Sequence, residues 1–403
     1  MASMNSPLVI IGAGQAASQL VASLAQDGFQ GEICLVGDEP HLPYQRPPLS
    51  KKFLAGELAL ERLYVKPAAF YEKAGSRLLL GQHAERIDRA GRAVLLADGS
   101  RLPYSTLVLA TGSRPRELPL PGAFYLRNIA DVDAIRARLA PGKSLVVIGG
   151  GYIGLELAAV ATKLGVGVTV LEQAPRLMAR GVGPVVSRFY ARLHGEEGVT
   201  IRTGAVVRSL EGNGTIKRVV CDDARYDADI VVIGAGAVPN VELAREAGLA
   251  VKDGIAVDAQ CRTDDASIWA IGDCTSQHHD LVGRRLRLES VHNALEQARI
   301  AAAAICGRKP PAIQVPWFWT DQYDVKMQMA GLSAGHDHAV VRGNPDTGRS
   351  FAVFYMREGT LIAVDAVNRA PEFMMSKQLI AERAKIDPAR LGDEGVAMKE
   401  MRN

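Results

Sequence analysis

Cysteine is scarce in this chain: only five of its 403 residues are cysteines. None of them forms a C-x-x-C pair, and their spacing fits neither a zinc ribbon nor an iron–sulfur cluster. We therefore expect reduced thiols with structural roles rather than a disulfide framework or a metal centre. The five are Cys34, Cys221, Cys261, Cys274 and Cys306.

The chain also lacks a strong charge of one sign and a long apolar run. Its formal net charge is +3 and it has no dense run of lysine and arginine, so nothing indicates nucleic-acid binding. No apolar stretch reaches the roughly 18 residues that a membrane-spanning helix needs. Residues 1–7 have neither the basic n-region nor the apolar h-region of a signal peptide. We therefore expect a cytoplasmic location.

Metal-binding and hydrolase signatures are missing as well. The histidines of His278-His279 and His336-x-His338 lie in polar, turn-like sequence without a matched set of carboxylates or cysteines, so we expect no metal site. Serine, histidine and aspartate are all present, but the nucleophile elbow of the hydrolases is not.

What the chain does have is a pattern of strand, glycine turn, helix and strand that occurs twice. The first copy has apolar strands at 8–11 and 32–36, with a helical run to about residue 27 between them. The second has strands at 144–148 and 168–171, around a helix that ends near residue 164. Continuous apolar strands are typical of a parallel sheet that is buried on both faces. The sequence therefore predicts an α/β protein with two Rossmann-like folds.

The rest of the chain completes these folds and adds a third region. Apolar strands that end in small residues, at 107–112 and 230–236, close the two halves. Residues 254–273 and an alanine-rich helix at about 290–306 are expected to rejoin the first fold. After residue 311 apolar and polar residues alternate and helical sequence follows, which predicts a C-terminal α+β domain.

The first glycine motif is Gly12-x-Gly14-x-x-Ala17. Gly12 permits the tight turn, Gly14 lets a pyrophosphate approach the backbone, and the small Ala17 lets helix and strand pack closely. The phosphates are then expected at the helix N-terminus, where free N–H groups and the helix dipole favour anions. The second strand runs into Asp38 and Glu39, and Asp38 has the better position to accept hydrogen bonds from a ribose.

The second motif, Gly149-Gly-Gly151-x-x-Gly154, contains the full G-x-G-x-x-G pattern, and its second strand ends at Glu172. A carboxylate there binds the adenine-side ribose hydroxyls and repels the extra phosphate of NADP, so NADH is favoured. Arg176 lies close by in sequence and could soften that preference.

Two such sites in one chain imply two dinucleotides, and FAD with a nicotinamide is the natural pair. The apolar strand before Asp273 ends in an acid that can hydrogen-bond a flavin's ribityl chain, and this segment rejoins the first fold. FAD is therefore assigned to the N-terminal motif. The expected domains are an FAD-binding domain (1–113 and 240–311), an NAD-binding domain (114–239) and a C-terminal α+β domain (312–403).

At this point the sequence resembles the two-dinucleotide flavoprotein reductases related to glutathione reductase, over nearly the whole chain. Within that superfamily four strings are similar to the ferredoxin reductases of oxygenase systems. They are Arg46-Pro-Pro-Leu-Ser-Lys51, Gly149 to Glu156, Ala294-Leu-Glu-Gln-Ala298 and Pro316-Trp-Phe-Trp319-Thr-Asp-Gln322.

The resemblance implies particular site residues. Lys51 is expected beside the flavin and paired with Glu156, and Trp319 is expected near the flavin from the C-terminal domain. The implied FAD contacts are Gly12, Gly14, Ala16, Asp38, Arg46, Lys51, Ala84, Thr111, Arg127, Asp273 and Val291, with Ala17 at the third motif position. The expected NAD contacts are Gly149, Gly151, Ile153, Gly154, Glu172 and Gly236.

The resemblance also implies the route of the electrons. Disulfide reductases of this superfamily pass electrons from flavin to a cysteine pair, but residues 45–51 contain no cysteine. Electrons are therefore expected to leave directly from the flavin, singly, to a 2Fe-2S ferredoxin that serves a cytochrome monooxygenase or a Rieske dioxygenase. Such ferredoxins are acidic, and Lys66 and Arg299 are the candidate contacts. The alternatives are a redox-sensing flavoprotein of the apoptosis-inducing-factor type and an NADH oxidase.

Overall fold

The computed structural model of the protein describes residues 6–212 and 217–401, and the chain divides into two compact units. Each unit is assembled from three stretches of sequence. Unit 1 comprises 1–46, 59–114 and 237–314, and unit 2 comprises 47–58, 115–236 and 315–403. Unit 2 thus holds most of the expected NAD-binding and C-terminal domains together, and the finer division into three domains stays a prediction.

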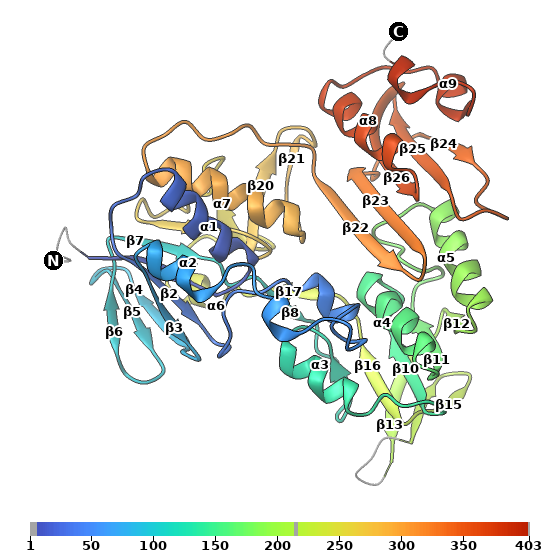
Figure 1. Ribbon diagram of the computed structural model, residues 1–403, viewed down its shortest axis with the longest axis horizontal. Coiled ribbons are helices and arrows are strands. Elements are labelled where there is room, and N and C mark those ends of the chain that lie inside the picture. Colours follow the sequence, from blue (N-terminus) through green and yellow to red (C-terminus); the bar gives the residue numbers. More distant parts are fainter. Residues whose placement is uncertain (1–5, 213–216, 402–403) are drawn as a thin grey trace. The chain divides into compact units, whose positions relative to one another are not determined.

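Unit 1 is built on a five-stranded parallel sheet (Figure 1). Every residue of the strands β1 (Leu8–Ile11) and β2 (Ile33–Gly37) is buried, because apolar side chains occupy both faces. Helices α1 and α7 lie side by side on this sheet. In order across the sheet, the strands are β19 (Ile268–Ala270), β7 (Thr106–Leu109), β1 (Leu8–Ile11), β2 (Ile33–Gly37) and β3 (Ser76–Leu80).

Smaller elements complete unit 1. They are the helices α1 (Gln15–Gln26), α2 (Ala68–Lys73), α6 (Glu242–Glu246) and α7 (Val291–Ile305), an antiparallel sheet of β4 (Ala84–Asp88), β5 (Ala93–Leu96) and β6 (Arg101–Pro103), and a sheet of β18 (Ile255–Val257), β20 (Thr275–His279) and β21 (Arg284–Leu286). Two short strands, β8 (Ser113–Pro115) and β17 (Ala237–Pro239), lie where the chain passes between the units.

Unit 2 contains the second parallel sheet, again with five strands. In order they are β12 (Thr200–Thr203), β11 (Gly167–Glu172), β10 (Ser144–Ile148), β16 (Ile230–Ile233) and β9 (Phe124–Tyr125). The helices of this half are α3 (Ile129–Arg136), α4 (Tyr152–Lys163) and α5 (Pro184–Glu196), and a ribbon of β13 (Val207–Glu211), β14 (Arg218–Cys221) and β15 (Arg225–Asp227) flanks the sheet.

The C-terminal part of unit 2 is an antiparallel sheet with helices. Its strands, in spatial order, are β22 (Trp317–Gln322), β23 (Val325–Gly331), β26 (Thr360–Val367), β25 (Phe351–Arg357) and β24 (His338–Gly343). They are followed by α8 (Ala370–Ala381), α9 (Pro388–Gly392) and the 3-10 helix η3 (Met398–Glu400). Two further 3-10 helices precede α2, namely η1 (Pro47–Ser50) in unit 2 and η2 (Leu60–Arg62) in unit 1.

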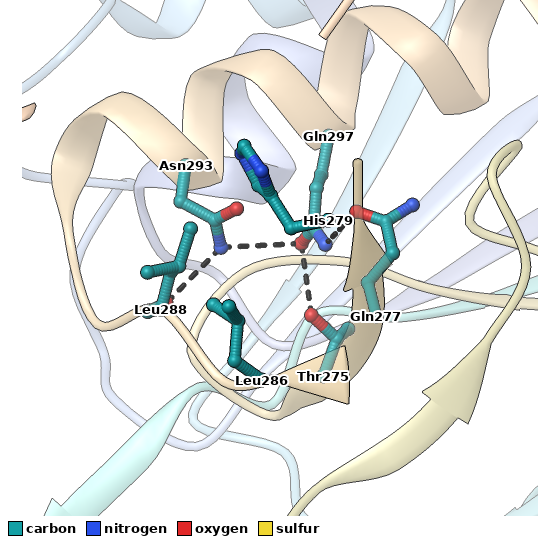
Figure 2. Close-up of a pocket in the computed structure, with 7 residues that line it drawn as sticks. All are labelled: Thr275, Gln277, His279, Leu286, Leu288, Asn293 and Gln297. Atoms are coloured by element: carbon teal, nitrogen blue, oxygen red, sulfur yellow. Dashed lines mark hydrogen bonds between the residues drawn. The ribbon is translucent and has the colours of Figure 1, made fainter. Parts of the chain in front are cut away.

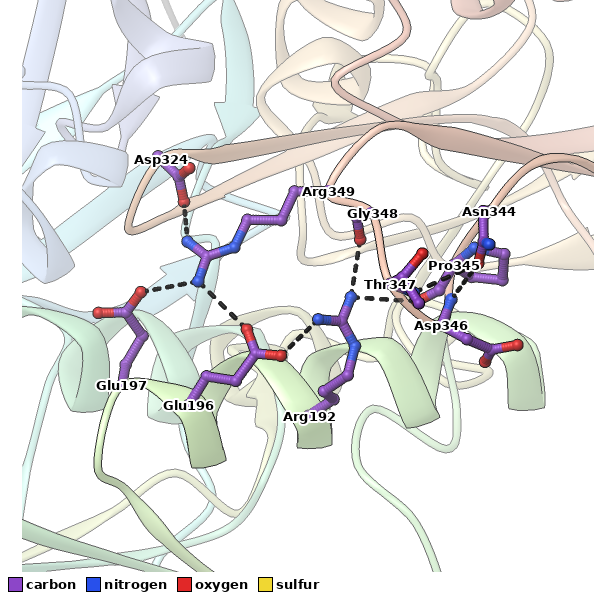
Figure 3. A network of polar contacts seen from close by, with 10 residues as sticks. All are labelled: Arg192, Glu196, Glu197, Asp324, Asn344, Pro345, Asp346, Thr347, Gly348 and Arg349. Atoms are coloured by element: carbon purple, nitrogen blue, oxygen red, sulfur yellow. Dashed lines mark hydrogen bonds and ion pairs between the residues drawn. The ribbon is translucent and has the colours of Figure 1, made fainter.

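A network of charged side chains joins helix α5 to the antiparallel sheet (Figure 3). Arg349 donates to Asp324 in the β22–β23 turn at 2.6 Å and to Glu197, just after α5, at 3.0 Å. Arg192 on α5 donates to the carbonyl oxygen of Gly348 at 2.7 Å. These contacts attach both the β22–β23 turn and the β24–β25 loop to the C-terminal end of α5.

The predicted fold class is therefore confirmed: two parallel, Rossmann-like sheets precede a C-terminal antiparallel sheet with helices. The expected strands and glycine-turn helices differ from the observed ones by at most three residues at their ends; the largest differences are at the strands expected at 107–112 and 230–236, which end at Leu109 and Ile233. The prediction about a signal peptide rests mainly on residues 1–5, which lie outside the described residues.

Candidate dinucleotide sites

The turn from β1 to α1 leaves room for an anion. Gly12 has a φ of +105°, and a Cβ there would overlap the carbonyl oxygen of Ala110, so only glycine fits. Gly14 is the N-cap of α1; no side chain caps the helix, and no atom lies within 4 Å of where its Cβ would stand. Ala16 and Ala17 are buried in the core. The first N–H groups of α1 therefore remain free for a pyrophosphate.

The acid after β2 is accessible. The Asp38 side chain is 71% exposed and its Oδ1 lies 3.3 Å from Nδ1 of His83. Its neighbour Glu39 accepts instead from Nη2 of Arg46 at 2.9 Å and from the hydroxyl of Tyr44 at 2.5 Å. Of the two acids, Asp38 is the one left at the surface for a ribose.

Arg46 is held firmly within unit 1. Besides Glu39, it donates through Nη1 to the hydroxyl of Tyr44 at 3.0 Å, and its guanidinium lies 5.0 Å from the Tyr44 ring centroid. Sequence reasoning named Glu39 only as the weaker ribose candidate and missed Tyr44, and it connected neither side chain with Arg46, which both of them orient. Glu39 and Tyr44 lie only 7 and 2 residues from Arg46 in the sequence, and this closeness was the signal that could have predicted the contacts.

The turn that carries Asp273 is held by helix α7, and Figure 2 shows Gln297 of this helix hydrogen-bonded to Thr275, two residues after Asp273. Oε1 of Gln297 accepts from the backbone N–H of Gly272 at 2.7 Å and from the hydroxyl of Thr275 at 3.0 Å. Asp273 accepts from the hydroxyl of Ser113 at 3.0 Å. Gln297 is fully enclosed, and sequence reasoning missed it because its partners lie 22 and 25 residues away.

The remaining FAD candidates of unit 1 have separate surroundings. Thr111 and Asn240 exchange two hydrogen bonds, at 2.6 and 2.8 Å, each between a side chain and the other's carbonyl oxygen. Ala84 is buried at the start of β4. Val291 is the first residue of α7, after the N-cap Ser290, whose hydroxyl accepts from the N–H of Asn293 at 3.1 Å.

The second glycine turn repeats the geometry of the first in unit 2. Gly149 has a φ of +114°, and Gly151 is the N-cap of α4 without a side-chain cap. A Cβ on Gly154 would overlap the carbonyl oxygen of Gly149, so helix α4 can approach the turn only with glycine there. Ile153, by contrast, is 44% exposed, which is unusual for a large apolar side chain and fits a ligand-facing position.

The acid that ends β11 is held by backbone groups. Glu172 accepts from the N–H of Gly150 and from that of Ala174, both at 2.7 Å. Arg176 donates to the carbonyl oxygens of Val182 and Ala179 at 2.8 and 2.9 Å, so its guanidinium is occupied within its own loop.

Gly236, with a φ of +98°, has an arginine beside it that sequence reasoning missed. The guanidinium of Arg180 lies 2.7 Å from where a Cβ on Gly236 would stand. Arg180 is exposed, and its guanidinium lies beside the loop of Gly236, which the sequence assigns to the nicotinamide cofactor.

The expected pair of Lys51 and Glu156 is formed within unit 2. Nζ of Lys51 lies 2.7 Å from Oε2 of Glu156, and only 5% of the Glu156 side chain is exposed. Two hydroxyls also donate to this carboxylate, Ser50 to Oε2 at 2.5 Å and Thr320 to Oε1 at 2.6 Å. The charge of a buried carboxylate is thus met by three donors. Lys51 further donates to the carbonyl oxygen of Pro47 at 3.2 Å.

Two other residues predicted to lie at the flavin, Trp319 near it and Arg127 as an FAD contact, also belong to unit 2. Trp319 lies on β22, half-buried, with its ring 5.5 Å from that of Trp317. Arg127 precedes α3, and its N–H donates to Asp131 at 2.9 Å. Lys51, Trp319 and Arg127 are thus in unit 2 and the other FAD candidates in unit 1.

The cysteines are all free and none is placed for catalysis. Four are buried and Cys306 is half-buried. Burial raises the pKa of Cys34, Cys261 and Cys274, which disfavours the reactive thiolate. Among the described residues no group of three metal-binding side chains gathers, and no helix there is long and apolar enough to cross a membrane.

Comparison with known proteins identifies the family. A model of the pyridine nucleotide-disulphide oxidoreductases matches residues 6–298, and a reductase C-terminal model matches 317–402. Putidaredoxin reductase from Pseudomonas putida is 45% identical over 98% of this chain and 97% of that protein. The ferredoxin–NAD(+) reductase component of the anthranilate 1,2-dioxygenase system from Burkholderia cepacia is 42% identical over 98% of both.

The fold agrees over the same length. The crystal structure of the covalent putidaredoxin reductase–putidaredoxin complex matches 99% of this chain and 98% of that chain, with a TM-score of 0.96 and 44% identity. The chain therefore belongs to the pyridine nucleotide-disulphide oxidoreductase family, in the branch of FAD-containing ferredoxin reductases that includes putidaredoxin reductase.

Proposed function

We propose that this protein passes electrons from NADH, through FAD, to an acidic 2Fe-2S ferredoxin that serves an oxygenase. The names of its relatives support this role: one is a component of a dioxygenase system, and another is solved as a complex with its putidaredoxin. A cytoplasmic location, where NADH is available, fits the same role.

The observation that carries the proposal is the Lys51–Glu156 ion pair in a segment without cysteine. In the disulfide reductases the corresponding position would supply a cysteine pair to receive electrons. Here it supplies an ammonium, 2.7 Å from a buried carboxylate that α4 positions. With the described thiols free and largely buried, no sulfur relay is available and electrons leave directly from the flavin.

The two dinucleotide cradles, which are the β1–α1 turn with Gly12 and Gly14 and the β10–α4 turn with Gly149 and Gly151, have residues that fit dinucleotides. When bound, FAD supplies a ring that accepts hydride from NADH and can release two electrons one at a time. The uncapped N-termini of α1 and α4 would each receive a pyrophosphate. Asp38 and Glu172 would hold the ribose hydroxyls, Asp273 the ribityl chain, and Lys51 would place its positive charge beside the flavin. Trp319 would cover the flavin from the C-terminal sheet.

NADH is the proposed electron donor in preference to NADPH. Glu172 presents a carboxylate where the phosphate of NADPH would lie, and two backbone N–H groups hold it in place. Arg176, the cation that could offset this charge, donates to carbonyl oxygens of its own loop. Repulsion of the phosphate is therefore not compensated by that arginine.

Stopped-flow mixing of the purified flavoprotein with NADH tests the proposal, with NADPH in parallel and a 2Fe-2S ferredoxin plus cytochrome c added in a second step. We expect rapid loss of flavin absorbance with NADH, slower loss with NADPH, and cytochrome reduction that requires the ferredoxin. Slow bleaching and a long-lived charge-transfer band would favour the redox-sensing alternative. Rapid bleaching followed by direct reduction of oxygen would favour an NADH oxidase.

A further inference from the structure

The buried carboxylate of Glu156 is the end of a chain of hydrogen bonds that runs through three elements of unit 2. Thr320 and Gln322 lie on β22, His194 lies in the last turn of α5, and Tyr323 follows β22 directly. Thr320, Gln322 and His194 are almost completely buried, with exposed fractions of 0%, 1% and 0%. Polar side chains this deep need partners, and here they have each other.

The distances are short throughout the chain. The hydroxyl of Thr320 lies 2.6 Å from Oε1 of Glu156, and Nε2 of Gln322 lies 3.1 Å from the Thr320 hydroxyl. Nε2 of His194 lies 2.8 Å from Oε1 of Gln322, and the Tyr323 hydroxyl lies 3.1 Å from Nδ1 of His194.

The carboxylate determines the direction of every bond. A carboxylate only accepts, so Thr320 must give its single proton to Glu156. The Thr320 oxygen must then accept, so Gln322 turns its NH₂ toward it and its carbonyl oxygen toward His194. His194 must therefore carry a proton on Nε2, and its Nδ1, if unprotonated, accepts from Tyr323. All the donors thus point toward Glu156, and aligned hydrogen bonds strengthen one another.

The outer members have the protonation states that this direction requires. Burial lowers the pKa of His194, which keeps the ring neutral with one N–H. Burial raises the pKa of Tyr323 to about 12, so its hydroxyl keeps its proton.

We propose that Tyr323, His194, Gln322 and Thr320 are positioning residues that fix the orientation of Glu156 toward Lys51 and lessen its negative charge beside the flavin. The inference rests on the proposed function, because it takes Lys51 to lie at the flavin. The proposal gives the β22–β23 hairpin a role beyond carrying Trp319. The hairpin acts on the ion pair through Oε1 of Glu156, whereas Ser50 and Lys51 contact Oε2.

The first test uses Thr320→Val, which keeps the shape but removes the donor, and Gln322→Glu, which reverses the chain because a carboxylate accepts from Thr320. Each variant leaves Oε1 of Glu156 without its proton donor. The less compensated negative charge disfavours the anionic reduced flavin. We expect a more negative flavin midpoint potential and about a tenfold slower reduction by NADH at saturation.

Thr320→Ser and Tyr355→Phe are the matched controls. The serine keeps the donor and is expected to stay within about twofold of the wild type. Tyr355 is an equally buried hydroxyl of unit 2 whose partners are Asp365 and Gly183, so its loss is expected to lower the melting temperature without changing the flavin potential. The double variant Thr320→Val/Gln322→Leu adds no charge and is expected to have the flavin potential of Thr320→Val alone, since Gln322 is proposed to act on Glu156 only through Thr320.

A second test examines the hydrogen-bond chain by a measurement that does not depend on flavin chemistry. Long-range ¹H–¹⁵N correlation on histidine-labelled protein reports the tautomer of each imidazole, and the His194 signal is the one missing in His194→Gln. We expect the Nε2–H tautomer. An Nδ1–H tautomer overturns the proposal, as does an unchanged flavin potential in both Thr320→Val and Gln322→Glu. If NADH fails to reduce even the wild type, the proposed function is wrong. The flavin potentials of the variants, measured by chemical titration, still test whether the hydrogen-bond chain acts on Glu156.

Discussion

Lys51 shows how one residue depends on its neighbours for a functional role. A lysine at the surface would be strongly hydrated and mobile, with little influence on a cofactor. Here only 18% of its side chain is exposed, and it donates both to Glu156 and to the carbonyl oxygen of Pro47. The ammonium is therefore held at one place, which an electrostatic role at a flavin requires.

Replacing Lys51 by methionine keeps the length and removes the charge. The buried Glu156 then loses its cation, and the flavin site becomes more negative. We expect the first-order rate of flavin reduction by NADH to fall roughly 10- to 100-fold, the size expected for one charged transition-state contact. Stopped-flow absorbance gives this rate. Lys52→Met, a change to the neighbouring exposed lysine, is the control and should leave it unchanged.

Asp365 makes a second prediction at this scale, about stability. It is 3% exposed on β26 and accepts from the Tyr355 hydroxyl at 2.6 Å, and burial raises its pKa from 3.8 to about 7. The folded state therefore binds the proton more tightly than the unfolded state does. The stabilisation is fully present below about pH 4 and is lost as the pH rises through about 7.

Asp365→Asn removes this titration. We expect the melting temperature of the wild type, relative to the variant, to fall as the pH rises from about 4 to about 7 and then to level off. Differential scanning fluorimetry across this range measures the difference. The histidines whose pKa is lowered by burial, such as His194, contribute equally to both proteins and cancel. A difference that is constant with pH would contradict the assignment.

At the scale of elements, the two glycine-turn helices are built alike. Both α1 and α4 begin at an uncapped glycine with open space around it, whereas α3 and α7 are capped by the side chains of Asn128 and Ser290. A capped helix has already satisfied some of its free N–H groups, and an uncapped one has not. Helix α5 also begins at an uncapped glycine, but a Cβ on Gly183 would meet the Tyr355 hydroxyl at 2.6 Å. The open space at Gly14 and Gly151, together with the missing cap, is therefore what fits α1 and α4 for a ligand.

Two alanine substitutions on α4 separate packing from ligand binding. Gly154→Ala would drive its Cβ into the carbonyl oxygen of Gly149, so we expect a loss of stability of roughly 1–3 kcal/mol, seen as a lower melting temperature. Gly151→Ala meets no atom within 4 Å and has an ordinary φ of −83°, so the fold should tolerate it. Its methyl group would point into the proposed pyrophosphate site, and the KM for NADH should rise instead. Equal effects of the two on stability would contradict this reading.

At the scale of the whole molecule, the proposed partner contact is a matter of charge. The net charge of the chain is only +3, so attraction of an acidic ferredoxin must come from local basic residues. Lys66 and Arg299 are both exposed in unit 1, and neither contributes to the dinucleotide cradles described above. Redox partners typically meet over small, transient interfaces, where single charges change the encounter rate.

Charge reversal at Lys66 or Arg299 is expected to raise the apparent KM for ferredoxin about three- to tenfold at low salt, with a smaller effect at high salt. NADH-dependent reduction of a small dye should stay nearly unchanged, because hydride transfer does not involve either residue. Steady-state assays with both acceptors measure the two effects. If dye reduction falls as much as ferredoxin reduction, these residues do not form the partner surface.

The sequence by itself determined the features that depend on local backbone geometry. The glycine turns, the strands around them and the acids at 38 and 172 could be predicted because a tight turn, a free helix N-terminus and a strand end are specified within a few residues. The family resemblance, which the comparisons confirm, rests on the same short strings.

Only the tertiary structure decided which side chains meet across the fold. Ser50 and Thr320 reach Glu156 over 106 and 164 residues of sequence, His194 reaches Gln322 over 128, and no local pattern predicts such contacts. They arise because packing buries these polar groups together, and a buried donor or acceptor must find its partner wherever the fold places one. Local stereochemistry thus makes the two glycine-turn sites predictable from sequence. Long-range packing determines how the Lys51–Glu156 pair, which is proposed to lie at the flavin, is held.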